Sequence, residues 1–424
     1  MSILIKNVLV EGKERTIYIE GNVIVAINDA ASGKSGVGEA EFVIDGSGKA
    51  AIPGLYNAHT HAAMTLLRGY ADDIPLQEWL ETKIWPIEAK MTEEDVYWGT
   101  KLACLEMIKS GTIFFNDMYW YWEGIAKAVT ESGIRAMLSA VFIDGFNEEK
   151  AQEQIKRNEG LYKESKSYPK RIIFALGPHA IYTVSESSLC WTLEFAEKHD
   201  LLVHIHVSET ETEVEDCVKR YGMRPVEYLD KIGFLSPRTI ACHCTHLTRN
   251  EIMLLKKHDV KIVHNPTSNM KLVSGREPYE ELKELGLNPN IALGTDGCAS
   301  NNNLDMFEEM KIASLLHKLY SGDPTSMPAN EAFELATRNA ARMFRLNSGV
   351  IAEGRLADIA LLDLKNEALV PNHNLISNIV YSANGSCVDT VICDGEILME
   401  GRKVEGEEEI KEKAQEVAYD LVSR

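Results

Sequence analysis

Histidines and acidic residues recur in short motifs that each follow an apolar run, and side chains of these types can hold a metal ion. The motifs are NAHTH (57–61), HIHVSE (204–209), CHCTH (242–246) and GTDG (294–297). Imidazole and carboxylate ligands suit Zn²⁺ or a similar divalent cation. A buried aspartate beside histidines also leaves an uncompensated charge unless a cation or a proton balances it. The four motifs together therefore predict a metal site.

Two of these motifs contain a pair of histidines two residues apart. Side chains on an extended strand alternate between its two faces, so both members of such a pair point the same way. His59 and His61 can therefore reach the same ion. His204 and His206 also share a face, and the spacing alone leaves open which of them is a ligand. The end of a strand is the better place for a ligand, which favours His206 and leaves His204 as a packed residue.

Further side chains are candidates for the chemistry around such an ion. Glu209 lies three residues after His206 and fits either a proton donor or an ordinary carboxylate at the start of a helix. His243 is the candidate in the third motif, with His246 as the alternative. Asp296 ends an apolar run ahead of a glycine, although an aspartate in such a place can also cap a helix.

Eight apolar runs of strand length alternate with amphipathic segments, and the motifs lie at the ends of four of the runs. The runs span residues 51–59, 112–117, 135–142, 171–178, 201–207, 239–244, 260–265 and 291–296. Eight strand–helix alternations over about 300 residues predict a closed (β/α)8 TIM barrel of the α/β class. An open doubly wound sheet is the alternative, but the sequence lacks the glycine-rich phosphate turn expected after its first strand. Barrel enzymes keep their active sites at the carboxyl ends of the strands, so a barrel would gather the motifs at one mouth.

Both ends of the chain have the pattern of short strands rather than of barrel units. Residues 3–48 contain four such segments separated by glycine and asparagine turns, and strand patterns return at 357–364 and 388–400. These segments predict a small composite β-sandwich domain formed by both termini. The predicted domains are 1–51 with 350–424 for the sandwich, and 52–349 for the metal-dependent barrel.

Composition and charge exclude several classes of function. Of the 424 residues, 45% are hydrophobic and 25% are charged, and the net charge of −20 argues against binding to nucleic acid. No run reaches the roughly 18 consecutive apolar residues of a membrane helix, and the chain does not begin with a signal-peptide pattern. The eight cysteines are scattered without a C-x-x-C motif. We therefore expect a cytoplasmic protein with reduced cysteines and no nucleic-acid or membrane partner.

The motifs, taken in chain order, resemble those of the amidohydrolase superfamily. The matches are NAHTH, HVSE (206–209), HCTH (243–246), TDG (295–297) and GVIAEGRLADIALLD (349–363). The resemblance implies a barrel flanked by a composite sandwich, with the metal bound by His59, His61, His206 and Asp296. Dinuclear members use a carboxylated lysine on strand 4, and residues 172–180 contain no lysine. One divalent ion per subunit is therefore expected, Zn²⁺ first, with Fe²⁺ or Mn²⁺ as alternatives.

Several loops resemble a narrower group, the methylthioadenosine/S-adenosylhomocysteine deaminases, which includes the archaeal 5′-deoxyadenosine deaminases. The matching segments are 64–92, 177–180, 241–247 and 294–310. Trp79 and Glu88 match loop residues that pack against the nucleoside and bind the ribose hydroxyls, and His179 matches a substrate-binding histidine. The resemblance implies hydrolytic deamination of the adenine ring to the inosine analogue and ammonia. The implied substrates are 5′-deoxyadenosine, 5′-methylthioadenosine, S-adenosylhomocysteine and adenosine.

This reaction gives each reactive side chain a role. Hydroxide must attack C6 of adenine while ring N1 receives a proton, and a divalent ion lowers the pKa of water from 15.7 to about 7. Asp296 is expected to accept the proton of that water, and Glu209 to bind the substrate and protonate N1. His243 is expected to hydrogen-bond the attacking oxygen.

One departure from the group concerns the 5′ side of the substrate. Some members have an arginine after strand 3 that holds the homocysteine carboxylate, whereas the aligned position here is Ala140 and only Arg135 remains nearby. We therefore expect small, uncharged 5′ groups to be preferred. The aromatic run 119–122 follows strand 2 and fits either the 5′ pocket or a packed surface.

Two other kinds of function stay open. A guanine or cytosine deaminase, or a triazine chlorohydrolase, would share the fold and the metal motifs, but none of their substrates carries a ribose for Glu88 to bind. A non-catalytic, metal-stabilised binding protein is the alternative from another class, and such a protein should have lost Glu209 or a ligand. The expected partner is a small nucleoside, and we also expect a homo-oligomer, either a dimer or a tetramer.

Overall fold

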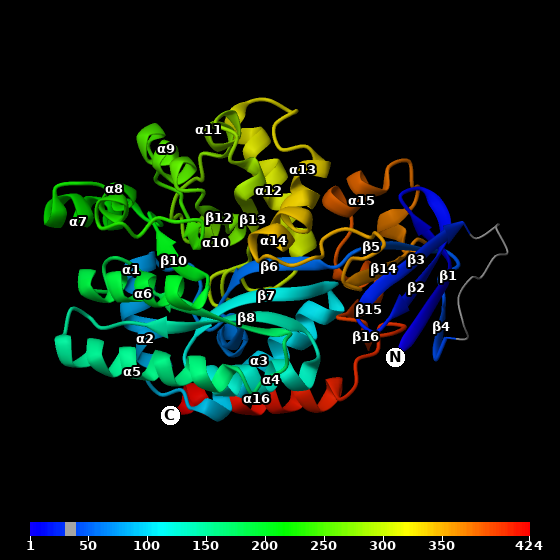
Figure 1. Ribbon diagram of the computed structural model, residues 1–424, viewed down its shortest axis with the longest axis horizontal. Coiled ribbons are helices and arrows are strands. Elements are labelled where there is room, and N and C mark those ends of the chain that lie inside the picture. The colour runs from blue at the N-terminus through cyan, green and yellow to red at the C-terminus, as the bar shows by residue number, and fades with distance from the viewer. Residues whose placement is uncertain (30–39) are drawn as a thin grey trace.

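A computed structural model describes residues 1–29 and 40–424, and a parallel sheet curled into a barrel forms its larger part (Figure 1). The strand order in this sheet is β13-β12-β11-β10-β9-β8-β7-β6, and every pair of neighbours is parallel. The strands are β6 Leu55–Thr60, β7 Thr112–Tyr119, β8 Arg135–Phe142, β9 Ile172–Pro178, β10 Val203–Val207, β11 Thr239–His243, β12 Lys261–His264 and β13 Ile291–Leu293.

Helices connect and cover these strands. They are α3 Glu93–Lys109, α4 Trp122–Ser132, α5 Glu148–Ser165, α6 Glu186–His199, α7 Glu211–Tyr221, α8 Pro225–Lys231, α9 Arg249–Lys257, α10 Pro266–Lys271, α11 Tyr279–Glu284, α12 Met306–Ser321, α13 Ala329–Leu335 and α14 Arg338–Met343, with the short helices α1 Leu76–Trp79 and α2 Trp85–Glu88 in the loop after β6. Because helices cover the outside of the sheet, the strands are buried on both faces, and all eight residues of β7 are buried. The predicted (β/α)8 barrel is confirmed.

Side-chain contacts close the barrel between its first and last strands. The side chain of Asn57 donates to Thr295 Oγ1 over 2.7 Å, and its amide oxygen accepts the Thr295 backbone N–H over 3.0 Å. The Asp296 backbone N–H then donates to the His59 carbonyl over 3.0 Å. A Cβ atom on Gly294 would lie only 2.7 Å from the His59 backbone nitrogen, so this position requires glycine. The seam thus holds Asp296 beside His59.

A second sheet combines strands from both ends of the chain. Its order is β16-β15-β14-β5-β1-β2-β3, with β4 paired to β1. The strands are β1 Ser2–Val10, β2 Lys13–Glu20, β3 Val23–Asp29, β4 Phe42–Asp45, β5 Lys49–Pro53, β14 Ile359–Asp363, β15 Val388–Cys393 and β16 Glu396–Met399. Ile3, Ile17 and Ile359 belong to a hydrophobic cluster of this sheet, separate from the barrel core. The composite β domain is therefore present, while its exact limits stay a prediction.

The apolar run 51–59, predicted as one strand, belongs to two. Strand β5 ends at Pro53 in the second sheet and β6 begins at Leu55 in the barrel, with Gly54 between them. A Cβ atom on Gly54 would lie 2.4 Å from the side chain of Ile113, so glycine lets the chain cross from one sheet to the other at this point. Both strands are buried, so the residues on either side of Gly54 are mostly apolar. The sequence pattern therefore does not reveal the boundary between β5 and β6.

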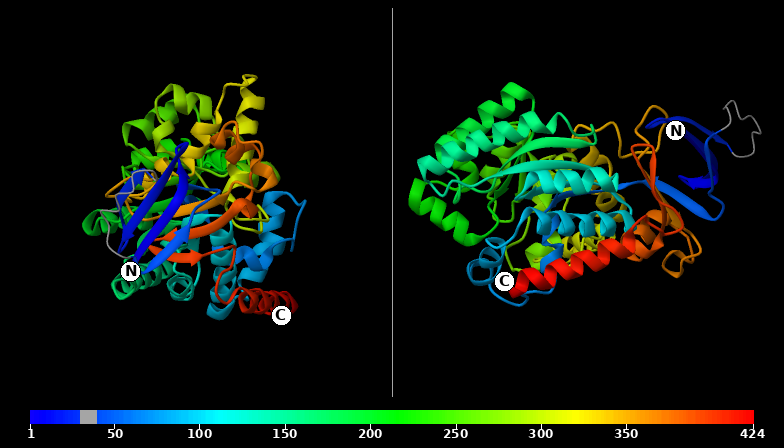
Figure 2. Two further views of the ribbon diagram at one scale, coloured as in Figure 1. Left: turned by 90° about the vertical axis from the view of Figure 1, so that its right-hand side faces the viewer. Right: turned by 90° about the horizontal axis from the view of Figure 1, so that it is seen from below.

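The last helix, α16 Glu407–Ser423, runs along the barrel rather than with the second sheet (Figure 2). The Arg424 guanidinium binds both carboxylate oxygens of Asp95 on α3, over 2.7 and 2.8 Å. Helix α15 (Leu375–Tyr381) also reaches the barrel, where the Tyr381 hydroxyl lies 2.9 Å from Ser314 Oγ on α12. Within the described residues, no helix is long and apolar enough to cross a bilayer.

Candidate metal centre and active site

A cavity of about 700 Å³ lies at the carboxyl ends of the barrel strands, and it gathers side chains that are far apart in the sequence. Eight of the predicted site residues line it, namely His61, Trp79, Glu88, His179, His206, Glu209, His243 and Asp296. The ninth, His59, is fully buried directly behind the lining. The barrel thus brings the four sequence motifs to one mouth.

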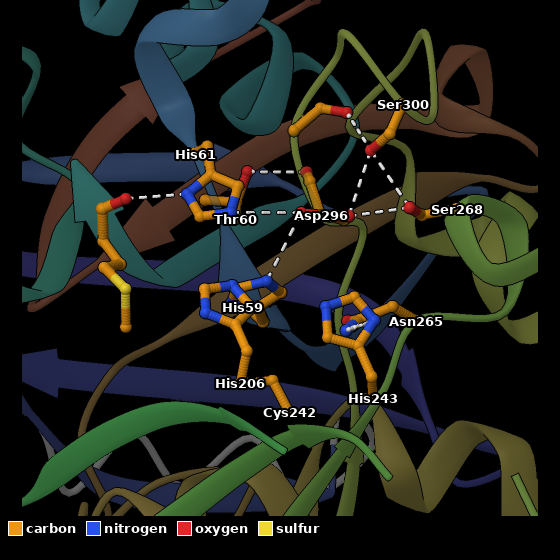
Figure 3. Close-up of polar contacts among 12 residues, drawn as sticks. His59, Thr60, His61, His206, Cys242, His243, Asn265, Ser268, Asp296 and Ser300 are labelled. Atoms are coloured by element: carbon orange, nitrogen blue, oxygen red, sulfur yellow. Dashed lines mark hydrogen bonds and ion pairs between the residues drawn. The ribbon is translucent and has the colours of Figure 1, made fainter. Parts of the chain in front are cut away.

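The predicted metal ligands converge on one point (Figure 3). His59 Nε2 and His61 Nε2 each lie 3.3 Å from Asp296 Oδ1. Ring nitrogens of His59, His206 and His243 also lie within 4.8 Å of one another. The predicted ligands are His59, His61, His206 and Asp296. His243 lies beside them on β11, the strand next to the β10 strand of His206.

Hydrogen bonds orient these rings so that their other nitrogen faces the centre. His61 Nδ1 donates to the Met118 carbonyl over 2.7 Å, and His206 Nδ1 donates to the His179 carbonyl over 2.8 Å. His59 Nε2 is buried, and no hydrogen bond satisfies it among the described residues. Lone pairs that converge on a carboxylate oxygen, one of them otherwise unsatisfied, fit a divalent cation.

The carboxylate of Asp296 is held from its far side. Its Oδ2 atom accepts hydrogen bonds from Ser268 Oγ over 2.7 Å and from Ser300 Oγ over 3.0 Å, which leaves Oδ1 toward the histidines (Figure 3). The residue lies beyond the end of β13 with a left-handed φ of 63°. This turn directs the side chain into the barrel mouth rather than along the strand.

His204 and His246, which the sequence left as alternative candidates, do not line the cavity. His204 lies in the barrel interior behind His59, with its Nε2 atom 2.8 Å from His59 Nδ1, and it does not line the cavity. His206 is the member of the pair that faces the cavity. His246 Nε2 donates to the Ser274 carbonyl over 2.6 Å and therefore holds a neighbouring loop.

Glu209 and His243 face each other across the cavity floor. Glu209 Oε2 lies 3.9 Å from His243 Nε2. His243 Nδ1 donates to Asn269 Oδ1 over 2.8 Å, so its Nε2 can donate toward the cavity when the ring is protonated. Burial lowers the pKa of His243, but the charges of Glu209 and Asp296 outweigh it and leave this pKa raised. Burial raises the pKa of the Glu209 carboxyl despite the nearby His243.

Comparison with known proteins agrees with this arrangement. The model of the amidohydrolase family matches residues 50–398. The chain belongs to the amidohydrolase family. The 5′-deoxyadenosine deaminase of Methanoregula boonei is 50% identical over 100% of this chain and 96% of its own length. The 5-methylthioadenosine/S-adenosylhomocysteine deaminase 1 of Archaeoglobus fulgidus is 50% identical over 99% of each chain.

A solved structure extends the comparison to three dimensions. The crystal structure of an adenosine deaminase from Xanthomonas campestris with bound zinc superposes with a TM-score of 0.93 at 34% identity. It covers 100% of this chain and 98% of the other. The predicted family and the predicted hydrolytic enzyme are confirmed, and this amidohydrolase shares its fold with a zinc-bound relative.

The amidohydrolase cavity also contains the residues expected to touch the substrate. Glu88 accepts a hydrogen bond from the Tyr119 hydroxyl over 2.7 Å. Burial raises the pKa of the Glu88 carboxyl, and the Tyr119 hydrogen bond only partly offsets this effect. Trp79 is anchored by its Nε1 atom, which donates to the Ala71 carbonyl over 2.9 Å. The ring of His179 lies 4.8 Å from that of His206, centroid to centroid.

The aromatic run after β7 forms one wall of this cavity. Tyr119, Trp120, Tyr121 and Trp122 all line it. Tyr119 and Trp122 are also buried, and Trp122 Nε1 donates to the Leu138 carbonyl over 3.1 Å. Of the two interpretations that the sequence left open, the run therefore belongs to the pocket, and its buried members pack there as well.

The two positions singled out for the 5′ side lie away from the cavity. Ala140 is fully buried inside β8 and does not contribute to the lining. Arg135 begins β8 at the opposite end of the barrel, where it binds Asp358 over 3.2 Å and Asp394 over 2.8 Å. Arg135 therefore joins the barrel to the second sheet and has no access to a substrate.

A cation that sequence reasoning missed does line the cavity. Arg157 on α5 contributes to the lining together with Gln154, and it forms an ion pair with Glu123 over 2.6 Å. The residue sits in the exposed, charge-rich pattern of α5, so no motif distinguishes it from the other charges of that helix. Only the packing of α5 beside the mouth places Arg157 at the cavity.

Proposed function

We propose that this amidohydrolase uses one divalent metal ion to deaminate the adenine ring of 5′-modified adenosines. The products are the corresponding inosine analogue and ammonia. The observation that carries the proposal is the shared cavity, in which Glu88 lies together with Glu209 and the Asp296 centre. Relatives that are about half identical over nearly the full length bear the names of deaminases of this kind, which supports the same substrate class.

The proposed metal ligands are His59, His61, His206 and Asp296. Their donor set suits Zn²⁺, and the similar crystal structure holds zinc; Fe²⁺ and Mn²⁺ are the alternatives. A carboxylated lysine cannot bridge two ions here, because β9 contains no lysine. When bound, such an ion supplies Lewis acidity and lowers the pKa of water, so that hydroxide is available at neutral pH.

Three side chains of this chain then carry the proton transfers. Asp296 accepts the proton of the attacking water and returns one to the departing ammonia, for which the two serine hydroxyls on Oδ2 keep its Oδ1 atom in place. Glu209, whose pKa is raised by burial, gives a proton to ring N1 and takes one back from the hydroxyl on C6 as ammonia leaves and the carbonyl forms. His243 donates a hydrogen bond to the oxygen that attacks C6 and so stabilises the developing charge.

Glu88 gives the site its preference for nucleosides. A buried carboxylate can accept hydrogen bonds from both ribose hydroxyls, and it discriminates strongly against substrates that lack them. The Tyr119 hydroxyl occupies one oxygen and orients the group. Trp79 packs against the nucleoside, and His179 contacts it from the β9 side.

The 5′ side of the pocket favours uncharged groups. The aromatic run 119–122 offers apolar and aromatic surface there, and the guanidinium of Arg157 is already paired with Glu123. A homocysteine carboxylate would have to compete with Glu123 for this arginine. We therefore propose 5′-deoxyadenosine and 5′-methylthioadenosine as better substrates than S-adenosylhomocysteine.

A panel of substrates tests the proposal directly. Ammonia release is measured for adenosine, 5′-deoxyadenosine, 5′-methylthioadenosine, S-adenosylhomocysteine, guanine, cytosine and a chlorotriazine. The highest kcat/KM is expected for an uncharged 5′-modified adenosine. A higher value for guanine or cytosine, or chloride release from the triazine, would replace the nucleoside assignment with one of the alternatives in the same fold.

A separate measurement concerns the predicted homo-oligomer. Light scattering on the same sample counts the subunits of the predicted dimer or tetramer.

A further inference from the structure

A second cluster of ligand-type side chains lies outside the cavity, and the proposed reaction does not use it. His264 ends β12, Glu277 lies in the loop between α10 and α11, and His317 is on α12. All three are buried, with exposed fractions of 1%, 1% and 0%. Three separate segments of the chain therefore direct polar side chains into one closed place.

The distances within this cluster are short. His264 Nδ1 lies 3.2 Å from Glu277 Oε2, and His264 Nε2 lies 3.2 Å from His317 Nε2. Each of the three residues offers a ligand atom within 4.8 Å of the others. The arrangement is thus as compact as the groups that converge on Asp296.

Several atoms of the cluster lack hydrogen-bond partners. Both oxygens of Glu277, Nδ1 of His264 and Nδ1 of His317 are buried, and none of them has a hydrogen bond among the described residues. A carboxylate buried in this way is costly unless a cation or a proton balances its charge. The nearest additional acid, Glu280, has one oxygen 3.7 Å from His317 Nδ1 and is partly exposed.

We propose that His264, Glu277 and His317 bind a second metal ion, Zn²⁺ or a similar divalent transition metal. Two imidazoles and one carboxylate are a common ligand set for zinc. An imidazole gives only one nitrogen to an ion. One nitrogen of each histidine and one carboxylate oxygen of Glu277 lie within 4.8 Å of one another, and small side-chain shifts bring such atoms to the roughly 3.3 Å that separates ligands around a tetrahedral ion. The alternative is a proton shared between the imidazoles and Glu277, without a metal.

The position of this site indicates a structural metal. It does not line the cavity, so a substrate cannot reach it, whereas an ion there would tie β12, the loop that carries Glu277 and α12 together. The same loop contains Ser274, whose carbonyl accepts the hydrogen bond from His246. The ion would therefore brace the segment that follows the His243 motif, without taking part in the reaction.

The test separates the two sites by removing the first. The double variant His59→Ala/His61→Ala is purified, dialysed against buffered Zn²⁺ and analysed for metal. It is expected to keep about one zinc per chain. Adding Glu277→Gln should weaken the affinity of the remaining zinc by at least about 10-fold, whereas adding Glu284→Gln should not. Glu284 is the matched control, because it lies on α11 in the same region and is exposed.

Two results overturn the proposal. One is a double variant that holds no zinc after this dialysis, and the other is zinc binding that is the same with Glu277→Gln and with Glu284→Gln. If Glu277→Gln does not fold, anomalous scattering at the zinc edge from crystals of the unaltered protein decides instead. A peak between His264 and His317 supports the site, and its absence assigns a proton. None of these measurements depends on activity, so they stand apart from the proposed deamination.

Discussion

His59 Nδ1 lies 2.8 Å from His204 Nε2, in the interior of the barrel below the metal centre. A ring that offers Nε2 to an ion carries its proton on Nδ1, so His59 donates this hydrogen bond. His204 Nδ1 then faces Ser139 Oγ over 3.2 Å, and Ser139 donates to Asn116 Oδ1 over 3.2 Å. A chain of hydrogen bonds therefore sets the orientation and the tautomer of a proposed ligand.

Replacing His204 should loosen the metal without touching a ligand. His204→Phe keeps a ring but removes the acceptor for His59, and the metal affinity should fall by roughly 10- to 100-fold. His204→Gln retains an acceptor oxygen and should recover part of this loss. Competition with a chelator of known affinity measures both variants. Equal affinity for wild type and His204→Phe would show that the hydrogen bond does not position His59.

The active centre itself should hold a single ion. His59→Ala/His61→Ala removes two of four proposed ligands, so its metal content should be lower than that of wild type by about one equivalent per chain, and deaminase activity should be lost. Elemental analysis of both proteins gives the difference. A difference of two equivalents would contradict a mononuclear centre.

Glu209→Gln tests the proton donor. The amide keeps the size of the side chain but has no transferable acid proton, so turnover should drop by roughly 10²-fold or more while the metal is retained. Glu211→Gln, on the exposed start of α7, is the control and should behave as wild type. If Glu209→Gln turns over at nearly the wild-type rate, another group protonates N1.

Glu88→Ala tests the nucleoside assignment. Loss of the charged acceptor should cost about 2–4 kcal/mol in transition-state binding, which is roughly 30- to 1000-fold in kcat/KM for 5′-deoxyadenosine. The penalty should be far smaller for a 2′-deoxy analogue, which already lacks one contact. Tyr119→Phe, which removes only the hydroxyl that orients Glu88, should cost roughly 2- to 10-fold. Equal penalties for ribose and deoxyribose substrates would exclude a ribose contact at Glu88.

Glu213 should make stability depend on pH. Burial raises its pKa to about 7 from 4.5, although its oxygens accept the backbone N–H groups of Ser208 and Glu209 over 2.9 and 2.7 Å. The folded protein therefore binds more protons than the unfolded chain between these two values. The contribution of Glu213 to stability is full below pH 4.5 and is lost as the pH rises to about 7.

Glu213→Gln removes this titrating group. It also removes one of the two hydrogen bonds that the Glu213 carboxylate accepts from the backbone N–H groups of Ser208 and Glu209. The difference in unfolding free energy between wild type and variant should therefore fall between pH 4.5 and 7, and kcat should drop roughly tenfold. Urea unfolding across this range measures the first effect. Glu215→Gln, 59% exposed on the same helix, is the control. A difference that does not change with pH would place the pKa of Glu213 near its ordinary value.

The sequence alone determined the architecture and the main motifs of this protein. Eight apolar runs with motifs at their ends are enough to predict a barrel, because the alternation of buried strands with amphipathic helices has few other solutions. The histidines and acids at strand ends could be assigned to one mouth by the same topology. The two-residue spacing of His59 and His61 also follows from the geometry of an extended chain.

Only the tertiary structure decided where residues of the same type lie relative to the cavity. His204 and His206 share a face of β10, and their separation depends on depth in the barrel, which the spacing does not encode. Arg135 and Arg157 are both cations near the same strand–helix unit, yet one lies at the far end of β8 and the other at the cavity.

The cluster of His264, Glu277 and His317 has no sequence motif, because its members come from three elements separated by up to about 50 residues. Local patterns report periodicity and chemistry along the chain. The approach of distant segments depends on how helices pack around the barrel, and that packing appears only once the whole chain has folded.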